Sequence, residues 1–240
     1  MEHSQFLRSE MILGENSTNI LSDKNVILFG LGGVGSYTAE ALARAGIGKL
    51  TIVDNDTVSV TNINRQLCAL HSTVGKPKVE VVRERILDIN PECKITAFQK
   101  FYLPENSDEF NLNDYNYIAD AIDTVSAKID LAKKSQELGI PIISCMGTGN
   151  KLDPTAFRVV DIHKTKVCPL ARVMRYELKK LGIKDVKAVY SEEEPIKPAE
   201  NPDDPQAGFR RSIPASNAFV PSVAGLIAAG EVIKDLAGIK

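Results

Sequence analysis

The sequence predicts an α/β protein whose Rossmann-like, doubly wound sheet is mainly parallel and has helices on both faces. Three observations favour this fold class. Apolar, strand-like segments alternate with helical segments up to about residue 150, a glycine-rich turn joins the first such pair, and the connections are short. Hydrophobic residues make up 43% and charged residues 25% of the 240 residues, as in ordinary globular domains. Beyond residue 150 the pattern changes, which indicates an appended C-terminal part.

The expected elements follow one another in order. The first strand, Val26–Phe29, is an apolar run that ends at a glycine turn. A helix follows, because Tyr37, Ala41 and Leu42 recur at helical spacing before Gly46 ends the pattern. The stretch KLTIVD at 49–54 supplies the next strand. Further helices are expected at 78–89 and 126–138, and further strands at 94–99, 115–123 and 140–146.

The C-terminal part adds elements of a different kind. FRVVDIHKT at 157–165 predicts an additional strand, and 168–183 predicts a helix with Pro169 in its first turn and Gly182 at its end. The prolines and acids of 191–208 predict a surface loop, and an apolar helix closes the sequence. We expect one domain over 1–240, with its core at about 20–150 and an extension at 151–240.

Charge and hydropathy exclude some classes of protein. The formal net charge of -2 gives no global attraction to nucleic acid, so any such contact must come from a local patch. The first twenty residues contain no apolar segment typical of a signal peptide, and the apolar C-terminal run is broken by Pro221, Glu231, Lys234 and Asp235. We expect a cytoplasmic protein without a membrane span, and peripheral membrane association stays open.

The four cysteines are expected to be reduced thiols. Cys68, Cys93, Cys145 and Cys168 lie far apart and form no CxxC pair, so no structural zinc is expected. Cys145 and Cys168 are interpreted as packing residues. A thiol role for Cys168, at the start of a predicted helix, is the less favoured alternative.

The glycine turn indicates a nucleotide site. Gly30, Gly32 and Gly35 form a GxGxxG motif between a strand and a helix, where the backbone can approach a phosphate. Asp54 closes the second strand 24 residues after Gly30, at the position of a carboxylate that binds ribose hydroxyls. These features fit NAD and ATP equally well.

The stretch DNDTVSVTNINRQ favours ATP. Arg65 can bind phosphate oxygens through two N–H groups, and Asn62 or Asn64 can donate hydrogen bonds to them. Lys78 starts a helix nearby, and Asp123 ends a strand where a carboxylate could hold Mg²⁺ beside phosphates. The candidate nucleotide-binding residues are Gly30, Gly32, Gly33, Gly35, Asp54, Asp56, Asn62, Asn64, Arg65, Gln66, Lys78 and Asp123.

Four motifs in order, GLGGVGS, VDNDTVSVTNINRQ, GKPKVE and DAIDTVSAK, resemble the ubiquitin-activating-enzyme superfamily, which includes bacterial adenylating enzymes. The resemblance implies that the glycine turn contacts ATP and that Asp54 holds ribose. It further implies catalytic roles for Arg65 and Lys78 at the phosphates and for Asp123 as the Mg²⁺ ligand. Arg8 is similar to an arginine that reaches the ATP of the partner subunit.

One subfamily fits the remaining sequence best. Adenylating enzymes for sulfur carriers usually have two CxxC pairs, which are missing here, whereas 147–183, VYSEEEP and the terminal segment resemble the tRNA threonylcarbamoyladenosine dehydratases. That resemblance implies ATP-dependent, ligase-type ring closure on a modified adenosine of tRNA with loss of water. It also implies a homodimer and possible sulfur-transfer partners. The apolar terminal helix, with its small residues Ala224, Gly225, Ala228 and Ala229, likewise suggests a dimer contact.

A tRNA substrate requires a basic patch. Arg172, Arg175 and Lys179 share one face of a predicted helix and are expected to bind RNA phosphates. A solvated helix face explains the same pattern. Arg210 and Arg211 could extend the patch.

Lys151 follows a strand end, where it could bind the substrate carboxylate or lie in an exposed loop. Three alternatives to the dehydratase remain open. The first is an enzyme that adenylates the C-terminal glycine of a sulfur-carrier protein. The second is an NAD(P)-dependent oxidoreductase, and the third is a non-catalytic nucleotide-sensing scaffold.

Overall fold

The computed structural model describes residues 4–199 and 214–239 and confirms the predicted fold class. Its seven-stranded sheet has the order β3-β2-β1-β4-β5-β7-β6, and every neighbouring pair is parallel except β6 and β7 at one edge. The strands are β1 (Asn25–Phe29), β2 (Lys49–Val53), β3 (Lys94–Phe98), β4 (Tyr117–Asp120), β5 (Ile142–Cys145), β6 (Phe157–Asp161) and β7 (Lys187–Ser191).

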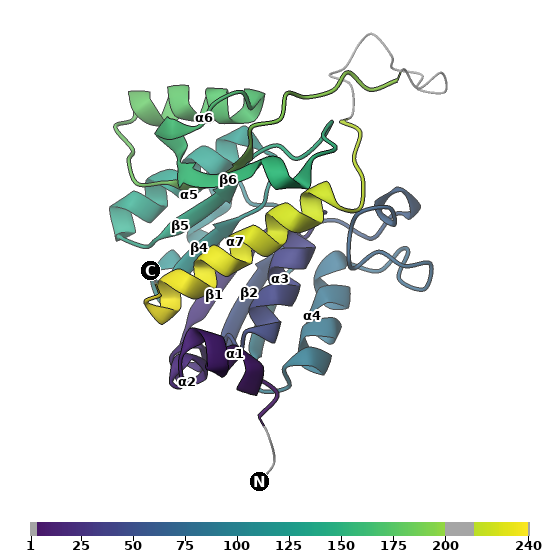
Figure 1. Cartoon of the computed structure of the whole chain (residues 1–240), viewed down its shortest axis with the longest axis vertical. Coiled ribbons are helices and arrows are strands. Elements are labelled where there is room, and N and C mark those ends of the chain that lie inside the picture. Colours follow the sequence, from purple (N-terminus) through teal and green to yellow (C-terminus); the bar gives the residue numbers. More distant parts are fainter. Residues whose placement is uncertain (1–3, 200–213, 240) are drawn as a thin grey trace.

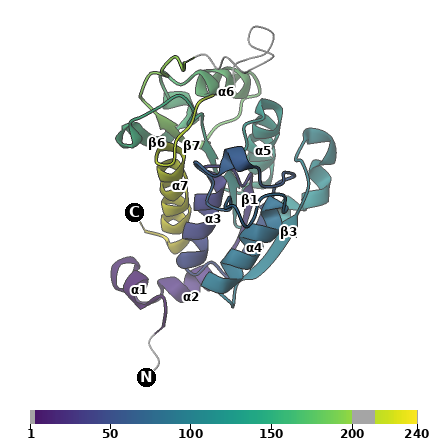
Figure 2. The same ribbon diagram turned by 90° about the vertical axis from the view of Figure 1, so that its right-hand side faces the viewer.

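Helices cover both faces of the sheet (Figures 1 and 2). Two short helices, α1 (Leu7–Leu13) and α2 (Ser17–Ser22), come first. One face carries α3 (Gly35–Arg44), α4 (Lys78–Ile89) and α7 (Val220–Ala237), and the opposite face carries α5 (Val125–Leu138) and α6 (Pro169–Lys180). None of the helices in the described ranges is long and apolar enough to cross a membrane.

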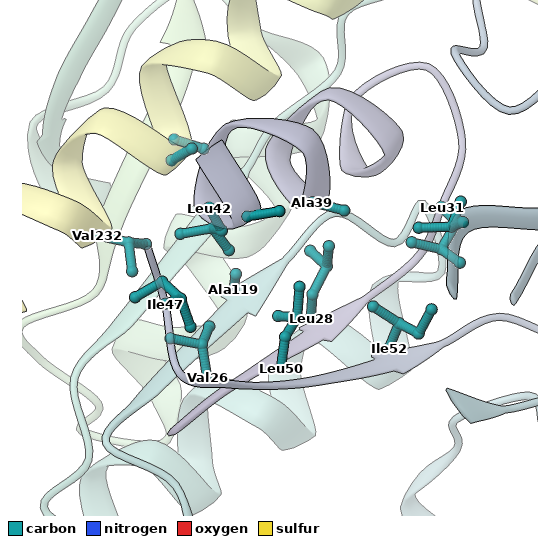
Figure 3. Close-up of a cluster of buried hydrophobic side chains, with 14 of the residues drawn as sticks. Val26, Leu28, Leu31, Ala39, Leu42, Ile47, Leu50, Ile52, Ala119 and Val232 are labelled. Carbon is teal, nitrogen blue, oxygen red and sulfur yellow. The ribbon is translucent and has the colours of Figure 1, made fainter. Parts of the chain in front are cut away.

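The side chains of β1 alternate between the two faces of the sheet and contribute to a hydrophobic core on each face. Val26 and Leu28 join the apolar cluster under α3 and α7, whereas Ile27 and Phe29 join the cluster under α5 and α6. Figure 3 shows Leu42 of α3 over the first of these clusters. A strand buried on both faces reads as an uninterrupted apolar run, which is why β1 could be predicted from the sequence.

The small residues of α7 pack inside the chain. A Cβ on Gly225 would lie 2.2 Å from the carbonyl oxygen of Val34, so α7 and the start of α3 are in close contact. Ala224, Ala228 and Ala229 are also buried in the core. The expectation that these four residues serve dimerisation is therefore wrong, because α7 uses them against its own α3 and sheet.

The structure also differs from the predicted elements in three places. The structure contains a strand, β7, that was not predicted, because Lys187–Ser191 runs directly into the acidic loop sequence. Ser191, the first residue of the loop expected at 191–208, belongs to this strand. The strand expected at 157–165 ends at Asp161, whose carboxylate accepts a hydrogen bond from His163 N at 2.8 Å and starts a 3₁₀ turn. Helices α1 and α2 were also not predicted. Residues 200–208 of that loop, Arg210 and Arg211 lie outside the described residues.

Candidate nucleotide-binding site

A cavity of about 520 Å³ opens at the carboxyl ends of the central strands. The chain leaves β1 toward β2 on one side, and β4 lies on the other, so this is the point where the strand order reverses. Parallel sheets bind ligands at such points because side chains and helix N-termini gather there. The residues predicted from the sequence that line it are Gly30, Gly32, Gly33, Asp54, Asp56, Asn62, Arg65, Gln66, Lys78 and Asp123.

The glycine turn brings β1 close to β4. Gly30 has a φ of +88°, and a Cβ on it would lie 2.7 Å from the Ala121 carbonyl oxygen. A Cβ on Gly35 would lie 1.8 Å from the carbonyl oxygen of Gly30, so only glycine fits there. Gly35 itself does not line the cavity. The third glycine of the motif therefore allows close packing.

Backbone N–H groups of the turn are available to an anion. Gly32, Gly33 and Val34 all line the cavity. Within residues 4–199 and 214–239, none of their N–H groups has a hydrogen-bond acceptor. Unpaired donors at the start of a helix, here α3, form a site that attracts phosphate.

Asp54 connects the glycine turn to the end of β2. Its Oδ2 accepts a hydrogen bond from Leu31 N at 2.6 Å, and its Oδ1 accepts one from Asp56 N at 2.9 Å. Burial raises the pKa of the Asp54 carboxyl, and the nearby positive charge of Lys78 opposes that shift. The carboxylate thus fixes the shape of the turn as well as facing the cavity.

Lys78 is held between two acids. Its side chain is only 5% exposed, and Nζ lies 2.7 Å from Asp56 Oδ2 and 4.0 Å from Asp54 Oδ1. The backbone repeats this contact, because Lys78 N donates to the Asp56 carbonyl at 3.0 Å. The amine is therefore fixed at the start of α4 before any polyanion arrives.

Asn62 and Gln66 extend the polar wall after β2. The side-chain Oδ1 of Asn62 accepts a hydrogen bond from Ser59 N at 3.0 Å and starts a 3₁₀ turn. Its Nδ2 has no acceptor among the described residues and remains free to donate. Gln66 is buried beside the turn, because a Cβ on Gly32 would lie 3.9 Å from its Nε2.

Asn64 orients Arg65 from outside the cavity. Nη1 of Arg65 donates to the Thr61 carbonyl and to Asn64 Oδ1, both at 2.9 Å. The other nitrogens of the guanidinium have no described partner and can bind an anion. Asn64 Nδ2 also donates to the Ser216 carbonyl at 3.0 Å. Asn64 therefore acts on the site through its neighbours and does not line it.

The motif DAID supplies two different acids. Asp123 is exposed and lines the cavity, as the sequence predicted. Asp120 is fully buried and pairs with Lys128 at 2.9 Å. Asp120 Oδ1 also accepts a hydrogen bond from Ile122 N at 3.1 Å, which fixes the segment before Asp123.

Sequence reasoning missed several lining residues. Lys100, Phe101 and Tyr102 follow β3, and the rule that ligands bind at strand ends could have indicated them. Thr148 follows β5 in the same way. Ser216 comes from a segment without any motif, so no sequence signal marked it.

Besides Gly35 and Asn64, two further predicted residues do not line the cavity. Arg8 lies on α1, which packs on α2 at the amino ends of the central strands, the end of the sheet opposite the cavity (Figure 1). Lys151 is 3% exposed, and its Nζ donates to the Glu193 carbonyl. Burial lowers the pKa of Lys151, while Cys168 and Glu193 oppose the shift. The free loop lysine considered for this position is therefore ruled out.

The other candidates lie elsewhere in the molecule. Arg172, Arg175 and Lys179 line a separate cavity on α6. All four cysteines are buried, and none lines the nucleotide cavity.

The fold and this cavity define a nucleotide-binding protein of the Rossmann-like class, whose cavity is lined on its polar side by Gly32, Gly33, Asn62, Arg65, Gln66 and Lys78. A family model identifies the lineage more closely, since the chain matches the ThiF family over residues 5–240. The chain belongs to this family, which confirms the resemblance drawn from the motifs.

Proteins of known name are similar to this chain over nearly its whole length. It is 46% identical over 239 residues to the tRNA threonylcarbamoyladenosine dehydratase of Bacillus subtilis, covering 97% of this chain and 94% of that protein. The crystal structure of the E. coli tRNA N6-threonylcarbamoyladenosine dehydratase in complex with ATP has a TM-score of 0.86 at 35% identity, with 98% and 94% coverage. The same enzyme in complex with AMP has a TM-score of 0.86 at 34% identity, with 98% and 96% coverage.

Proposed function

We propose that the chain is an ATP-dependent dehydratase that cyclises threonylcarbamoyladenosine in tRNA. One observation carries the proposal: unpaired N–H groups of the glycine turn lie in one cavity with Arg65 and Lys78. These groups suit a triphosphate rather than a nicotinamide dinucleotide. The relatives named as dehydratases support the substrate, and their ATP and AMP complexes support the nucleotide.

The first step is adenylation of the threonyl carboxylate. A carboxylate oxygen attacks the α-phosphorus of ATP, and pyrophosphate leaves. Charge develops on the phosphate oxygens, and Arg65 and Lys78 stabilise it because both are fixed by the protein before the reaction. Asp54 holds the ribose, and Asn62 donates to the phosphates from its free amide.

Magnesium fits beside Asp123. Mg²⁺ is commonly bound by one or two carboxylates together with substrate phosphates, and an exposed carboxylate in the cavity meets that need. In the described ranges no group of three or more His, Cys, Asp and Glu side chains gathers as a metal site. The ion would supply charge neutralisation at the phosphates.

The second step is ring closure. A nucleophilic atom of the same side chain attacks the acyl carbon, and AMP leaves with the former carboxylate oxygen, so the nucleoside loses one water in total. Because the reaction is intramolecular, proximity lowers the barrier and no nucleophile of the enzyme is needed. The buried positions of Cys145 and Cys168 agree with this scheme.

We further propose that two copies form a homodimer in which Arg8 reaches the partner's nucleotide. Arg8 is remote from its own cavity, and α1 also presents Met11 and Ile12, which are 80% and 83% exposed. Exposed large apolar side chains on one short helix suit a protein interface. Within each copy, residues 1–240 act as a single adenylating domain in the cytoplasm, with sulfur-transfer proteins as further partners. Lys151, whose buried amine donates to the Glu193 carbonyl, is the residue that we propose to position the substrate carboxylate.

The test is mass spectrometry of nucleosides from tRNA bearing threonylcarbamoyladenosine after incubation with protein and Mg-ATP. The expected result is loss of one water from that nucleoside in an ATP-dependent reaction, absent for Asp123→Ala although ATP binding persists in part. An unchanged nucleoside, with pyrophosphate exchange only when a sulfur-carrier protein is added, would overturn the proposal in favour of carrier adenylation. ATP binding without either reaction would favour a scaffold.

A further inference from the structure

A second cavity lies on the outer side of α6 and has no place in the scheme above. Its volume is about 580 Å³, within the range of pockets that hold small organic ligands. It is bordered by α6 and by the turn at 182–184 that leads to β7. The side chains that give it its chemistry are His163, Arg172, Arg175, Tyr176, Lys179 and Lys184.

The cavity carries uncompensated positive charge. Of its basic residues, Arg172, Lys179 and Lys184 form no salt bridge with any carboxylate in residues 4–199 and 214–239, and no acid borders the cavity. Arg175 is fixed, because its Nη1 donates to Thr165 Oγ1 at 2.7 Å. Unpaired cations around a hollow attract a polyanion.

An aromatic ring is fixed at the same place. Tyr176 is 61% exposed, and Lys180 Nζ lies 4.0 Å from the centroid of its ring. Tyr176 borders the cavity and Lys180 does not, so the ammonium of Lys180 contacts the ring from a position outside the cavity. This contact orients the ring and leaves it able to stack with another planar group.

Helix α6 connects the two cavities. A Cβ on Gly147 would lie 3.9 Å from Leu170 Cβ, so the first turn of α6 adjoins the residue before Thr148, which lines the nucleotide cavity. Arg172 follows within one turn, and Lys179 lies about 10 Å further along the axis. A strand of RNA that presents one nucleotide at the nucleotide cavity can follow the cations of α6.

We propose that the α6 cavity is a subsite for one unpaired nucleotide of an RNA loop, close in sequence to the nucleotide that reacts. Its base stacks on Tyr176, and the adjoining phosphates bind Arg172, Arg175 and Lys179. Single-stranded RNA is recognised by this combination of aromatic rings and cationic groups. An acidic protein segment would satisfy the cations but would leave the ring without a planar partner. The proposal deepens the proposed function and rests on it.

The test is the binding of an anticodon stem-loop RNA, measured by fluorescence anisotropy at several salt concentrations. Tyr176→Ala is expected to weaken binding about tenfold, in keeping with the loss of one stacked base, and Tyr176→Phe to leave it unchanged. Lys179→Gln is expected to reduce the salt dependence by about one phosphate contact. Arg83→Gln, on α4 and outside both cavities, is the matched control and should change nothing.

Two further readouts separate this proposal from the proposed function. RNA binding that depends on the tyrosine ring, without dehydration, would support the subsite and overturn the dehydratase. Dehydration with an unchanged KM for tRNA in Tyr176→Ala would support the dehydratase and overturn the subsite. Equal loss of binding in the Phe and Ala variants, with thermal melting unchanged, would also overturn it, since stacking needs only the ring. Loss of affinity for an acidic peptide but not for RNA would assign the cavity to a protein partner.

Discussion

Lys128 Nζ lies 2.9 Å from Asp120 Oδ2, and both side chains are completely buried. The ammonium also donates to the Cys145 carbonyl at 2.8 Å and lies 3.2 Å from Ser144 Oγ, so it joins the carboxyl ends of β4 and β5. Ser144 Oγ donates to the same carboxylate oxygen at 2.6 Å. This buried network fixes the segment that presents Asp123 to the nucleotide cavity.

Removal of the ammonium should destabilise the protein strongly. Lys128→Met leaves Asp120 buried without its countercharge, and breaking such pairs costs about 3–5 kcal/mol of the free energy of unfolding. Urea denaturation at pH 7 measures the loss. The double variant Asp120→Asn/Lys128→Met should recover part of it, because no unpaired charge remains. A loss below about 1 kcal/mol in the single variant would contradict the assigned role.

Asn64 should matter for catalysis although it does not line the nucleotide cavity. Asn64→Ala removes one of the two acceptors that orient Arg65 and the contact with Ser216. Loss of one such hydrogen bond to a charged group corresponds to about a tenfold fall in the rate of adenylate formation. Pyrophosphate exchange measures that rate. Asn113→Ala, an exposed residue remote from the site, is the control, and equal effects in both variants would refute the idea.

Two glycines of α7 should respond in opposite directions to alanine. Gly225→Ala places a methyl group 2.2 Å from the Val34 carbonyl oxygen and should destabilise by about 1–3 kcal/mol or more, since backbone must shift. Gly230→Ala meets nothing within 4 Å and should stabilise by about 0.5–1 kcal/mol, because alanine favours a helix. Thermal melting at equal concentration distinguishes them. Similar melting temperatures would show that α7 does not pack on α3 this closely.

Alkaline pH should unfold the protein early. Burial raises the pKa of Cys68 and Cys93 to about 11 and that of Cys145 to about 12. In the unfolded chain a thiol ionises near pH 8.5, so each cysteine stabilises the fold fully below that pH. As the pH rises toward the pKa values of the folded protein, the contribution of each cysteine to the free energy of unfolding falls by up to about 1.4 kcal/mol per pH unit.

Urea midpoints at pH 7, 8.5, 9.5 and 10.5 measure this loss. Burial also raises the pKa of Tyr102 and Tyr117, so the decline should continue above pH 10. Cys93→Ala should decline less steeply between pH 8.5 and 10.5. An unchanged slope would mean that this thiol does not titrate differently in the folded and unfolded states.

Strands β1 to β5 and most of the nucleotide cavity could be predicted from local patterns. Strands β1 and β4 are apolar because both of their faces are buried, and the cavity residues follow the ends of such strands. The pairing of Lys128 with Asp120 could not be predicted in this way. A lysine in an amphipathic helix normally faces solvent, and only the packing of α5 on the sheet places it in the core.

The extension was harder to predict because its structure depends on distant contacts. Strand β7 fits between β5 and β6, which precede it in sequence, and nothing in KAVYS indicates that position. The local sequence around Lys151 is also typical of an exposed loop, yet its amine donates a hydrogen bond to the carbonyl of Glu193, 42 residues later. Small residues in α7 fit a dimer or a close contact with α3, and sequence spacing does not distinguish the two.

The order of synthesis differs from the order of assembly in this molecule. Residues 29–148 supply most walls of the nucleotide cavity, but Ser216 and Pro221 complete it, and α7 covers the apolar face over β1. Strand β6 leaves the ribosome before β7, the strand with which it pairs among the described residues. A nascent chain stalled before α7 therefore has an open phosphate turn and an uncovered core. Nucleotide meets a complete cavity only after α7 has emerged, and chaperones that bind exposed apolar surface have their clearest opportunity just before that point.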